Sequence, residues 1–194
     1  MNETATALIL IDVQKGFDDP RMGANRNNPE AERNIARLIE RWRSSGQPVL
    51  HVQHMSRHPE SPLRPQQPGN DFKPEAAPHP GEPIFQKQVN SGFIGTGLEE
   101  WLHGKGIATI VLAGLTTDHC VSTTARMAAN LGFTTYVVAD ATATFERTGH
   151  DGRRYSADEV HRLALASLHE QFATILQTDE AINKLAESQP LSSR

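Results

Sequence analysis

The stretch IATIVLAGLTTDHCVSTT, from Ile107 to Thr124, decides the fold of this chain. Its apolar run up to Ala113 is short and rich in β-branched residues, which is typical of a buried strand in a parallel sheet. Gly114 ends the run, and a polar turn then opens a helix from about His119. The only cysteine, Cys120, is therefore expected in the first turn of a helix, at the carboxyl end of a central strand.

This position of Cys120 favours a chemical role, because open α/β sheets place their reactive groups beyond the carboxyl ends of the strands. The free N–H groups and partial positive charge of a helix N-terminus would favour the thiolate over the thiol. The alternative is a small buried core residue, as most free cysteines are. We predict a catalytic cysteine, mainly because of the residues that accompany it elsewhere in the chain.

Length and composition predict one globular domain, residues 1–194, with a proper hydrophobic core. The formal net charge is −4, and the sequence contains no basic stripe or polybasic segment, so neither nucleic acid nor a membrane is expected as a partner. The N-terminal MNETATALILIDVQ has no charged region before a short apolar run, so it is predicted to be a strand rather than a signal peptide. A single cysteine fits a reducing cytoplasm.

The first 53 residues have the pattern of a β-α-β unit. The strand from Thr4 to Val13 precedes a helix with Asn28 as its N-cap and Pro29 at its first position, and the strand from Pro48 to Gln53 follows. Such a unit implies a right-handed crossover and a parallel sheet.

The second half of the chain continues this alternation. Thr96 and Glu99 fit a capping box at the start of a helix. The further elements expected are a helix over 119–131, a strand over 134–139, a helix over 157–172 with Leu163 directed inward, a strand over 174–177 and a last helix capped by Thr178.

The segment from Met55 to Pro83 differs in composition, because prolines recur throughout it and apolar anchors are few. It is too long for an ordinary connection, so it is either a functional lid or a mobile excursion. We favour a lid over the pocket, because the segment returns directly into the short strand from Ile84 to Lys87.

Three chemically useful residues come at or near the ends of predicted neighbouring strands: Asp12, Lys87 and Cys120. A cysteine can act as nucleophile, a carboxylate can take its proton, and an ammonium can hold the charged partners. A carboxylate at the end of a buried strand also requires an explanation, because an unpaired buried charge is costly.

At this point the chain resembles a known family, the isochorismatase-like cysteine hydrolases. The matching pieces are ALILIDVQKGF (7–17), QKQVNSGFIGTGLEEWL (86–102), VLAGLTTDHCVSTTARMAANLGF (111–133) and YVVADATAT (136–144). The resemblance implies an α/β fold, a three-layer Rossmann-like sandwich with a central, mainly parallel six-stranded sheet, which usually forms homo-oligomers. It also implies an Asp-Lys-Cys triad at Asp12, Lys87 and Cys120. A cis peptide at Leu115–Thr116 and an oxyanion hole made by the N–H groups of Thr116 and Cys120 complete the implied site.

The resemblance further implies a hydrolase that cleaves the C–N bond of a small amide or lactam through a Cys120 thioester. HMSRHPESPLRP and FERTGHDGRRY are most similar to the branch that contains streptothricin hydrolase, which opens a cyclic amide. The residues expected to line the substrate pocket are Gln14, Phe17, His54, Phe93 and Val121.

No metal or other cofactor is expected. The nicotinamidase branch of the family binds a metal through an Asp-x-His motif after the second strand, and Gln53 and Met55 stand at those positions here. His119 offers a rival Cys-His pair, but adjacent residues on a helix point about 100° apart, so it cannot easily face the thiol.

Two other functions remain open from the sequence. An isochorismatase would hydrolyse a vinyl ether through Asp12, although such enzymes often lack the cysteine. A ligand-binding or redox-sensing module would need only a cysteine of low pKa, without an aspartate and a lysine beside it.

Overall fold

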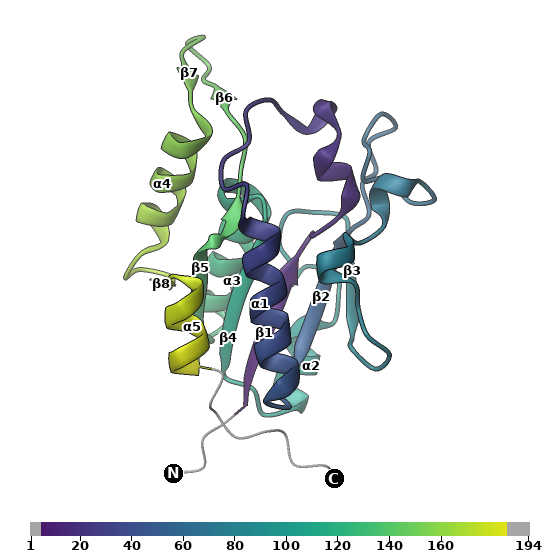
Figure 1. Ribbon diagram of the computed structural model, residues 1–194, viewed down its shortest axis with the longest axis vertical. Coiled ribbons are helices and arrows are strands. Elements are labelled where there is room, and N and C mark those ends of the chain that lie inside the picture. The colour runs from purple at the N-terminus through teal and green to yellow at the C-terminus, as the bar shows by residue number, and fades with distance from the viewer. Residues whose placement is uncertain (1–4, 186–194) are drawn as a thin grey trace.

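The computed structural model describes residues 5–185 and has an α/β architecture of three layers (Figure 1). The central six-stranded sheet is entirely parallel, with the strand order β3-β2-β1-β4-β5-β8. Its strands are β1 (Thr6–Ile11), β2 (Val49–His54), β3 (Ile84–Lys87), β4 (Thr109–Leu115), β5 (Thr134–Ala143) and β8 (Thr174–Leu176). Two short strands, β6 (Arg147–Thr148) and β7 (Arg154–Tyr155), form a separate antiparallel hairpin. The predicted fold class is therefore confirmed.

Helices cover both faces of this sheet. On one face lie α1 (Ala31–Ser44) and α5 (Thr178–Leu185), and on the other lie α2 (Leu98–Gly104), α3 (Ser122–Asn130) and α4 (Ala157–Leu168). Short turns of helix connect them: η1 (Lys15–Asp18), η2 (Pro20–Met22), η3 (Pro68–Asn70), η4 (Pro74–Ala76) and η5 (Thr117–Val121), the last with π-helical geometry. Within residues 5–185, none of the helices has the length and apolar character needed to cross a membrane.

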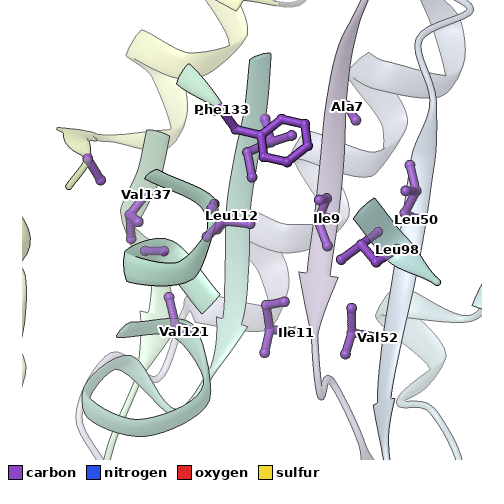
Figure 2. Packing of buried hydrophobic residues seen from close by; sticks show 14 of the residues in the cluster. Ala7, Ile9, Ile11, Leu50, Val52, Leu98, Leu112, Val121, Phe133 and Val137 are labelled. Atoms are coloured by element: carbon purple, nitrogen blue, oxygen red, sulfur yellow. The ribbon is translucent and has the colours of Figure 1, made fainter. Parts of the chain in front are cut away.

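The pleat of β1 explains why five successive residues of the strand are apolar. Successive side chains point to opposite faces of a sheet. Ile9 and Ile11 belong to the core under α2 and α3 (Figure 2), whereas Leu8 and Leu10 belong to the core under α1. Because both faces are covered, every residue of β1 is buried, and its apolar run from Ala7 to Ile11 replaces the alternation of a half-exposed strand.

The boundaries near the first helix differ from the prediction. The helix α1 begins at Ala31, and Asn28 adopts φ +46° instead of capping it. The Asn28 side-chain amide donates to the carbonyl groups of Ala139 and Thr142 in β5. Asparagine tolerates this left-handed backbone, and its side chain fixes the loop to the sheet.

Four details of the second half also differ. The strand β5 continues to Ala143, past a register shift opposite β4. At α2 the N-cap is Gly97, and Thr96 donates to the Gly92 carbonyl instead of forming a capping box with Glu99. The helix α4 ends at Leu168, and Leu163 is 64% exposed rather than inward. The turn η5 precedes α3, so Cys120 lies in a π-helical turn and not within a regular α-helix.

The proline-rich segment 55–83 packs on the body of the domain beside the strand ends. The buried Asn70 makes several of the contacts: its side chain donates to the carbonyl groups of His54 and Leu63. The Asn70 carbonyl in turn accepts from the amides of Gln14 and Gln53. These contacts tie the segment to the carboxyl ends of β1 and β2, beside the region in which the site lies.

Gly114 allows β4 to pass close to β1 at the sheet edge where the site is built. Its φ is +122°, and a Cβ atom there would lie 2.1 Å from the Ile11 carbonyl oxygen. No side chain fits without moving the backbone of one strand. We therefore expect Gly114→Ala to lower the free energy of unfolding by about 3 kcal/mol or more, measured by urea denaturation.

Gly106→Ala is the matched control, because Gly106 also has a positive φ, +67°, but open space around its missing Cβ. This control should cost only about 1 kcal/mol, the cost of the left-handed backbone alone. Equal losses in the two variants would contradict the steric explanation.

Candidate active site

The candidate site is formed where β3, β1 and β4 end at the same edge of the sheet. Asp12 follows β1 directly, Lys87 is the last residue of β3, and Cys120 lies in the turn after β4. The strand order brings these ends together, although the three residues are far apart in the sequence. Asp12 has φ +51°, a conformation that non-glycine residues rarely adopt outside functional sites and tight turns.

The Lys87 ammonium lies at the centre of the site. Its Nζ atom is 2.6 Å from Asp12 Oδ2, 3.3 Å from Cys120 Sγ and 3.0 Å from His54 Nδ1. An ammonium has three N–H donors, so these three contacts use all of them. Lys87 is 1% exposed and Asp12 is fully buried, so the pair is shielded from water and Lys87 is held in one position.

The two oxygens of Asp12 have different environments. Oδ2 accepts from Lys87, whereas Oδ1 is buried and has no hydrogen-bond partner in the described part of the chain. A carboxylate oxygen of Asp12 and the sulfur of Cys120 lie within 4.8 Å of each other. Burial of a carboxylate oxygen without a hydrogen-bond donor costs free energy. Asp12 therefore keeps an unused acceptor near the thiol.

Burial dominates the electrostatics of the site. It raises the pKa of the Asp12 carboxyl above its ordinary value, although the charge and hydrogen bond of Lys87 oppose this. Burial, and then the charge of Asp12, raise the pKa of the Cys120 thiol. The expectation that a helix N-terminus makes Cys120 a resting thiolate therefore does not fit the structure. A thiol beside a carboxylate of raised basicity fits it better.

His54 is neutral at physiological pH. Burial, followed by the nearby Lys87 charge, lowers the pKa of His54 to about 4. Because Lys87 can only donate, His54 Nδ1 must accept, and the ring proton resides on Nε2. His54 thus presents a single N–H donor.

A small cavity opens beside these groups. Its volume is about 220 Å³, below the range of pockets for drug-sized ligands. The residues that line it come from the carboxyl-end regions of β1, β2, β3 and β4, from the segment 55–83 and from β6: Asp12, Phe17, Met22, His54, Ser61, Leu63, Asn90, Thr116, His119, Cys120 and Arg147.

Of the five residues expected to line the pocket, Phe17 and His54 do so. Gln14, Phe93 and Val121 are not among the lining residues. Gln14 is fully buried and fixes the carbonyl groups of His54 and Asn70, whereas Phe93 and Val121 belong to the hydrophobic core. Phe93 stacks on Phe133, with ring centroids 5.7 Å apart.

The turn after β4 supplies backbone groups to the same cavity. The peptide bond Leu115–Thr116 is cis, as the resemblance implies, and Thr116 lines the cavity. The Thr116 carbonyl accepts from the N–H groups of His119 and Val121, which closes the turn. In the part of the chain that the structure describes, the Thr116 N–H has no acceptor.

His119 lines the cavity but does not pair with the thiol. Its side chain is 57% exposed, and Nε2 lies 3.4 Å from the carboxylate of Asp118. The Cys-His alternative is therefore not formed, because the ring is engaged on the side of Asp118.

Comparison with known proteins now identifies the family. Residues 6–180 match the model of the Isochorismatase domain. The chain belongs to the isochorismatase family. It is 49% identical over 181 residues to the uncharacterized isochorismatase family protein YrdC of Bacillus subtilis, which covers 93% of this chain and 96% of that protein. A solved structure of an isochorismatase-family protein from Chromobacterium violaceum has 44% identity and a TM-score of 0.89, with 94% of each chain covered.

Two relatives with named activities are more distant. Streptothricin hydrolase of Streptomyces noursei is 32% identical over 143 residues, which cover 72% of this chain and 50% of that protein. Maleamate amidohydrolase of Pseudomonas putida is 30% identical over 172 residues, which cover 80% of each. The resemblance seen in the sequence is thereby confirmed, and the protein is an isochorismatase-family hydrolase.

Three side chains of this hydrolase could in principle bind a metal, because ligand atoms of Asp12, His54 and Cys120 lie within 4.8 Å of one another. All three side chains contact the Lys87 ammonium, which lies between them. A cation held by the three would have to displace a buried lysine. The donor set therefore does not fit a metal, consistent with Gln53 and Met55 at the metal-motif positions.

Exhaustive chelation with EDTA or phenanthroline should accordingly leave turnover unchanged. Lys87 supplies the positive charge that a metal would otherwise provide, so the chelator has no metal ion to remove from the site. Activity assays before and after dialysis against the chelator check this. A loss that zinc or iron restores would contradict the assignment of Lys87 as the resident cation.

Sequence reasoning missed several lining residues, of which Asn90 and Arg147 are the polar ones that matter most. Asn90 Oδ1 is 3.9 Å from Cys120 Sγ, and Arg147 is the first residue of β6. Asn90 lies in a loop and Arg147 in a strand of only two residues, so no strand or helix pattern directed them to the site. The signals were two of the quoted segments: QKQVNSGFIGTGLEEWL contains Asn90, and FERTGHDGRRY contains Arg147.

Proposed function

We propose that this protein is a cysteine amidohydrolase, which cleaves the C–N bond of a small amide or lactam through a thioester on Cys120. The observation that carries the proposal is the Lys87 ammonium in contact with both the Asp12 carboxylate and the Cys120 sulfur. The names of the relatives streptothricin hydrolase and maleamate amidohydrolase support this reaction class.

In the first half-reaction, Asp12 accepts the thiol proton of Cys120 as the sulfur attacks the substrate carbonyl carbon. Oδ1 is suited to this step because it is buried without a donor. The backbone N–H groups of Thr116 and Cys120 hold the oxygen that becomes negative. Removal of one such donor costs about 3 kcal/mol in other enzymes. Collapse of the intermediate breaks the C–N bond, and the departing amine takes the proton from Asp12.

In the second half-reaction, water attacks the thioester carbon. Asp12 takes a proton from that water and returns it to the sulfur as the C–S bond breaks, which releases the acid and restores the thiol. Lys87 remains charged throughout and stabilises both the carboxylate and the sulfur. His54 keeps the third Lys87 donor occupied, so the lysine stays aimed at the reacting pair.

A panel of small primary carboxamides and lactams tests the proposal. Ammonia release reports the carboxamides, and the appearance of a new primary amine reports ring opening. Mass spectrometry of enzyme quenched with a slow substrate should show an acyl adduct on Cys120. Turnover of a vinyl ether without an adduct would favour isochorismatase chemistry instead. Absence of any turnover, together with reversible Cys120 oxidation, would favour a sensor.

The pH dependence of kcat/KM provides a further prediction. Asp12 must be ionised to accept the thiol proton, so activity should fall as the pH drops through the pKa of Asp12. Burial raises that pKa, so the acid limb should lie above 3.8, the ordinary value for an aspartate. His54 protonates only at about pH 4, so His54→Asn should retain the same limb. Loss of the limb in that variant would assign it to His54.

A further inference from the structure

The first two residues of the turn η5 are fixed to the rest of the domain through their side chains. Thr117 is fully buried, and its hydroxyl oxygen lies 2.9 Å from Nδ1 of His161. His161 belongs to α4, which packs against η5. The next residue, Asp118, is held by the Thr144 hydroxyl and by Arg147. The start of the turn is thus anchored to two different parts of the fold.

His161 itself lies behind the site. It is 8% exposed and is not among the residues that line the cavity. Burial lowers the pKa of His161 below its ordinary value, although the charges of Asp158 and Asp118 oppose this, so the ring is neutral at physiological pH. A neutral ring nitrogen and a hydroxyl can each donate or accept, so either tautomer keeps the bond to Thr117.

The place of Thr117 in the chain connects this bond to the proposed chemistry. Thr117 directly follows Thr116, whose N–H group is one of the two donors of the proposed oxyanion hole. Thr116 lines the cavity, and its N–H has no acceptor in the described residues 5–185. The strand β4 fixes the chain before Thr116, and Thr117 fixes it afterwards. A shift of Thr117 would therefore pass directly to Thr116.

The thiol at the other end of the turn is held by different contacts. Cys120 belongs to the hydrophobic core under α2 and α3, and its Sγ atom lies 3.3 Å from Lys87 Nζ. The helix α3 begins two residues after it, at Ser122. Loss of the Thr117 anchor should therefore displace the Thr116 N–H more than the Cys120 sulfur.

We propose that His161 is a positioning residue for the oxyanion hole: through the Thr117 hydroxyl it fixes the start of η5 and keeps the Thr116 N–H directed into the cavity. This inference rests on the proposed function, which supplies the oxyanion hole. Such donors act by being in place before the charge develops, so a small displacement weakens them in the transition state.

The test compares two reactions of the Cys120 thiol and needs no amide substrate. p-Nitrophenyl acetate acetylates a thiol through a tetrahedral oxyanion and releases p-nitrophenolate, so its rate reports the oxyanion hole. Iodoacetamide alkylates the thiol by displacement of iodide, without an oxyanion, so its rate reports the thiol alone. Intact mass follows both adducts, and Cys120→Ala gives the background from other residues.

His161→Leu removes the bond and should slow acetylation of Cys120 about tenfold, a part of the 10²–10³-fold cost of removing an oxyanion donor outright. Its alkylation rate should stay nearly unchanged. His161→Asn should restore most of the acetylation rate, because its amide group lies near the position of Nδ1 and can still donate or accept. Thr117→Val, which is nearly isosteric, should match His161→Leu. The double variant should be no slower than either, since the two side chains act as one unit.

Thr135→Val is the matched control. Thr135 is also a buried threonine, and its hydroxyl donates to the Phe133 carbonyl at the amino end of β5. This variant loses a buried hydroxyl of the same kind, and its Cys120 should be acetylated at the rate of the unmodified protein.

Equal slowing of both reactions in His161→Leu and Thr117→Val would make the bond a general structural contact and overturn the proposal. So would unchanged acetylation in a folded Thr117→Val variant. Absence of acetylation in the unmodified protein would refute the proposed oxyanion hole and this inference with it. Failure of the amide panel alongside normal acetylation would refute the proposed substrate class alone.

Discussion

Cys120→Ala should reduce amide hydrolysis by at least about 10⁴-fold, the scale on which removal of a nucleophile acts in other hydrolases. The thioester needs the sulfur, and no described residue in contact with Lys87 could replace it, since Asp12 and His54 are the other two partners. The measurement is kcat/KM on the best substrate of the panel. Mass spectrometry should show no acyl adduct in this variant.

Stability measurements separate lost chemistry from lost structure. Cys120 is 8% exposed and lies against the core, so alanine removes only a small buried volume and should leave thermal unfolding nearly unchanged. Cys120→Ser keeps the volume and tests whether a hydroxyl can act in the same place. Retention of more than a few per cent of activity in Cys120→Ala would contradict the nucleophile assignment.

Asp12→Asn should reduce the rate by about 10²–10⁴-fold, toward the upper end, because one carboxylate both accepts the thiol proton and protonates the leaving amine. Affinity for substrate analogues should change far less, since the side chain keeps its shape. Alkylation of Cys120 at neutral pH should also become slower, because the base that takes the thiol proton is lost. Loss of the Asp12 charge, which also raises the pKa of the thiol, acts in the opposite direction, but burial, the larger cause, remains.

The same variant has a structural cost that requires a control. Asn leaves Lys87 buried without its counter-charge, and breaking a buried ion pair typically costs about 3–5 kcal/mol. The double variant Asp12→Asn/Lys87→Met removes both charges and should recover stability without recovering activity. Near-normal turnover in Asp12→Asn would refute the proton-transfer role. Unchanged alkylation with lost turnover would confine Asp12 to protonation of the leaving group.

The sequence by itself determined the architecture and indicated the three residues of the proposed triad. Buried parallel strands are continuous apolar runs, so β1 and β4 could be recognised from Thr6–Ile11 and Thr109–Leu115 alone. Once the sheet was parallel, Asp12, Lys87 and Cys120 had to meet, because they follow strands whose carboxyl ends lie at one edge. Local pattern indicated the parallel sheet, and the family resemblance supplied the six strands and the roles of the proposed triad.

Only the tertiary structure decided the electrostatics and the walls of the site. Burial, and then the charge of Asp12, raise the pKa of the Cys120 thiol, whereas helix position alone predicts that the thiolate is favoured. Burial, and then the charge of Lys87, keep His54 neutral, and contact with Asp118 places Arg147; both partners are far away in the sequence. His54 and Lys87 end neighbouring strands, whereas Arg147 and Asp118 lie in a two-residue strand and a π-helical turn. Such short elements have no periodicity, so local sequence does not indicate which side chains will meet there.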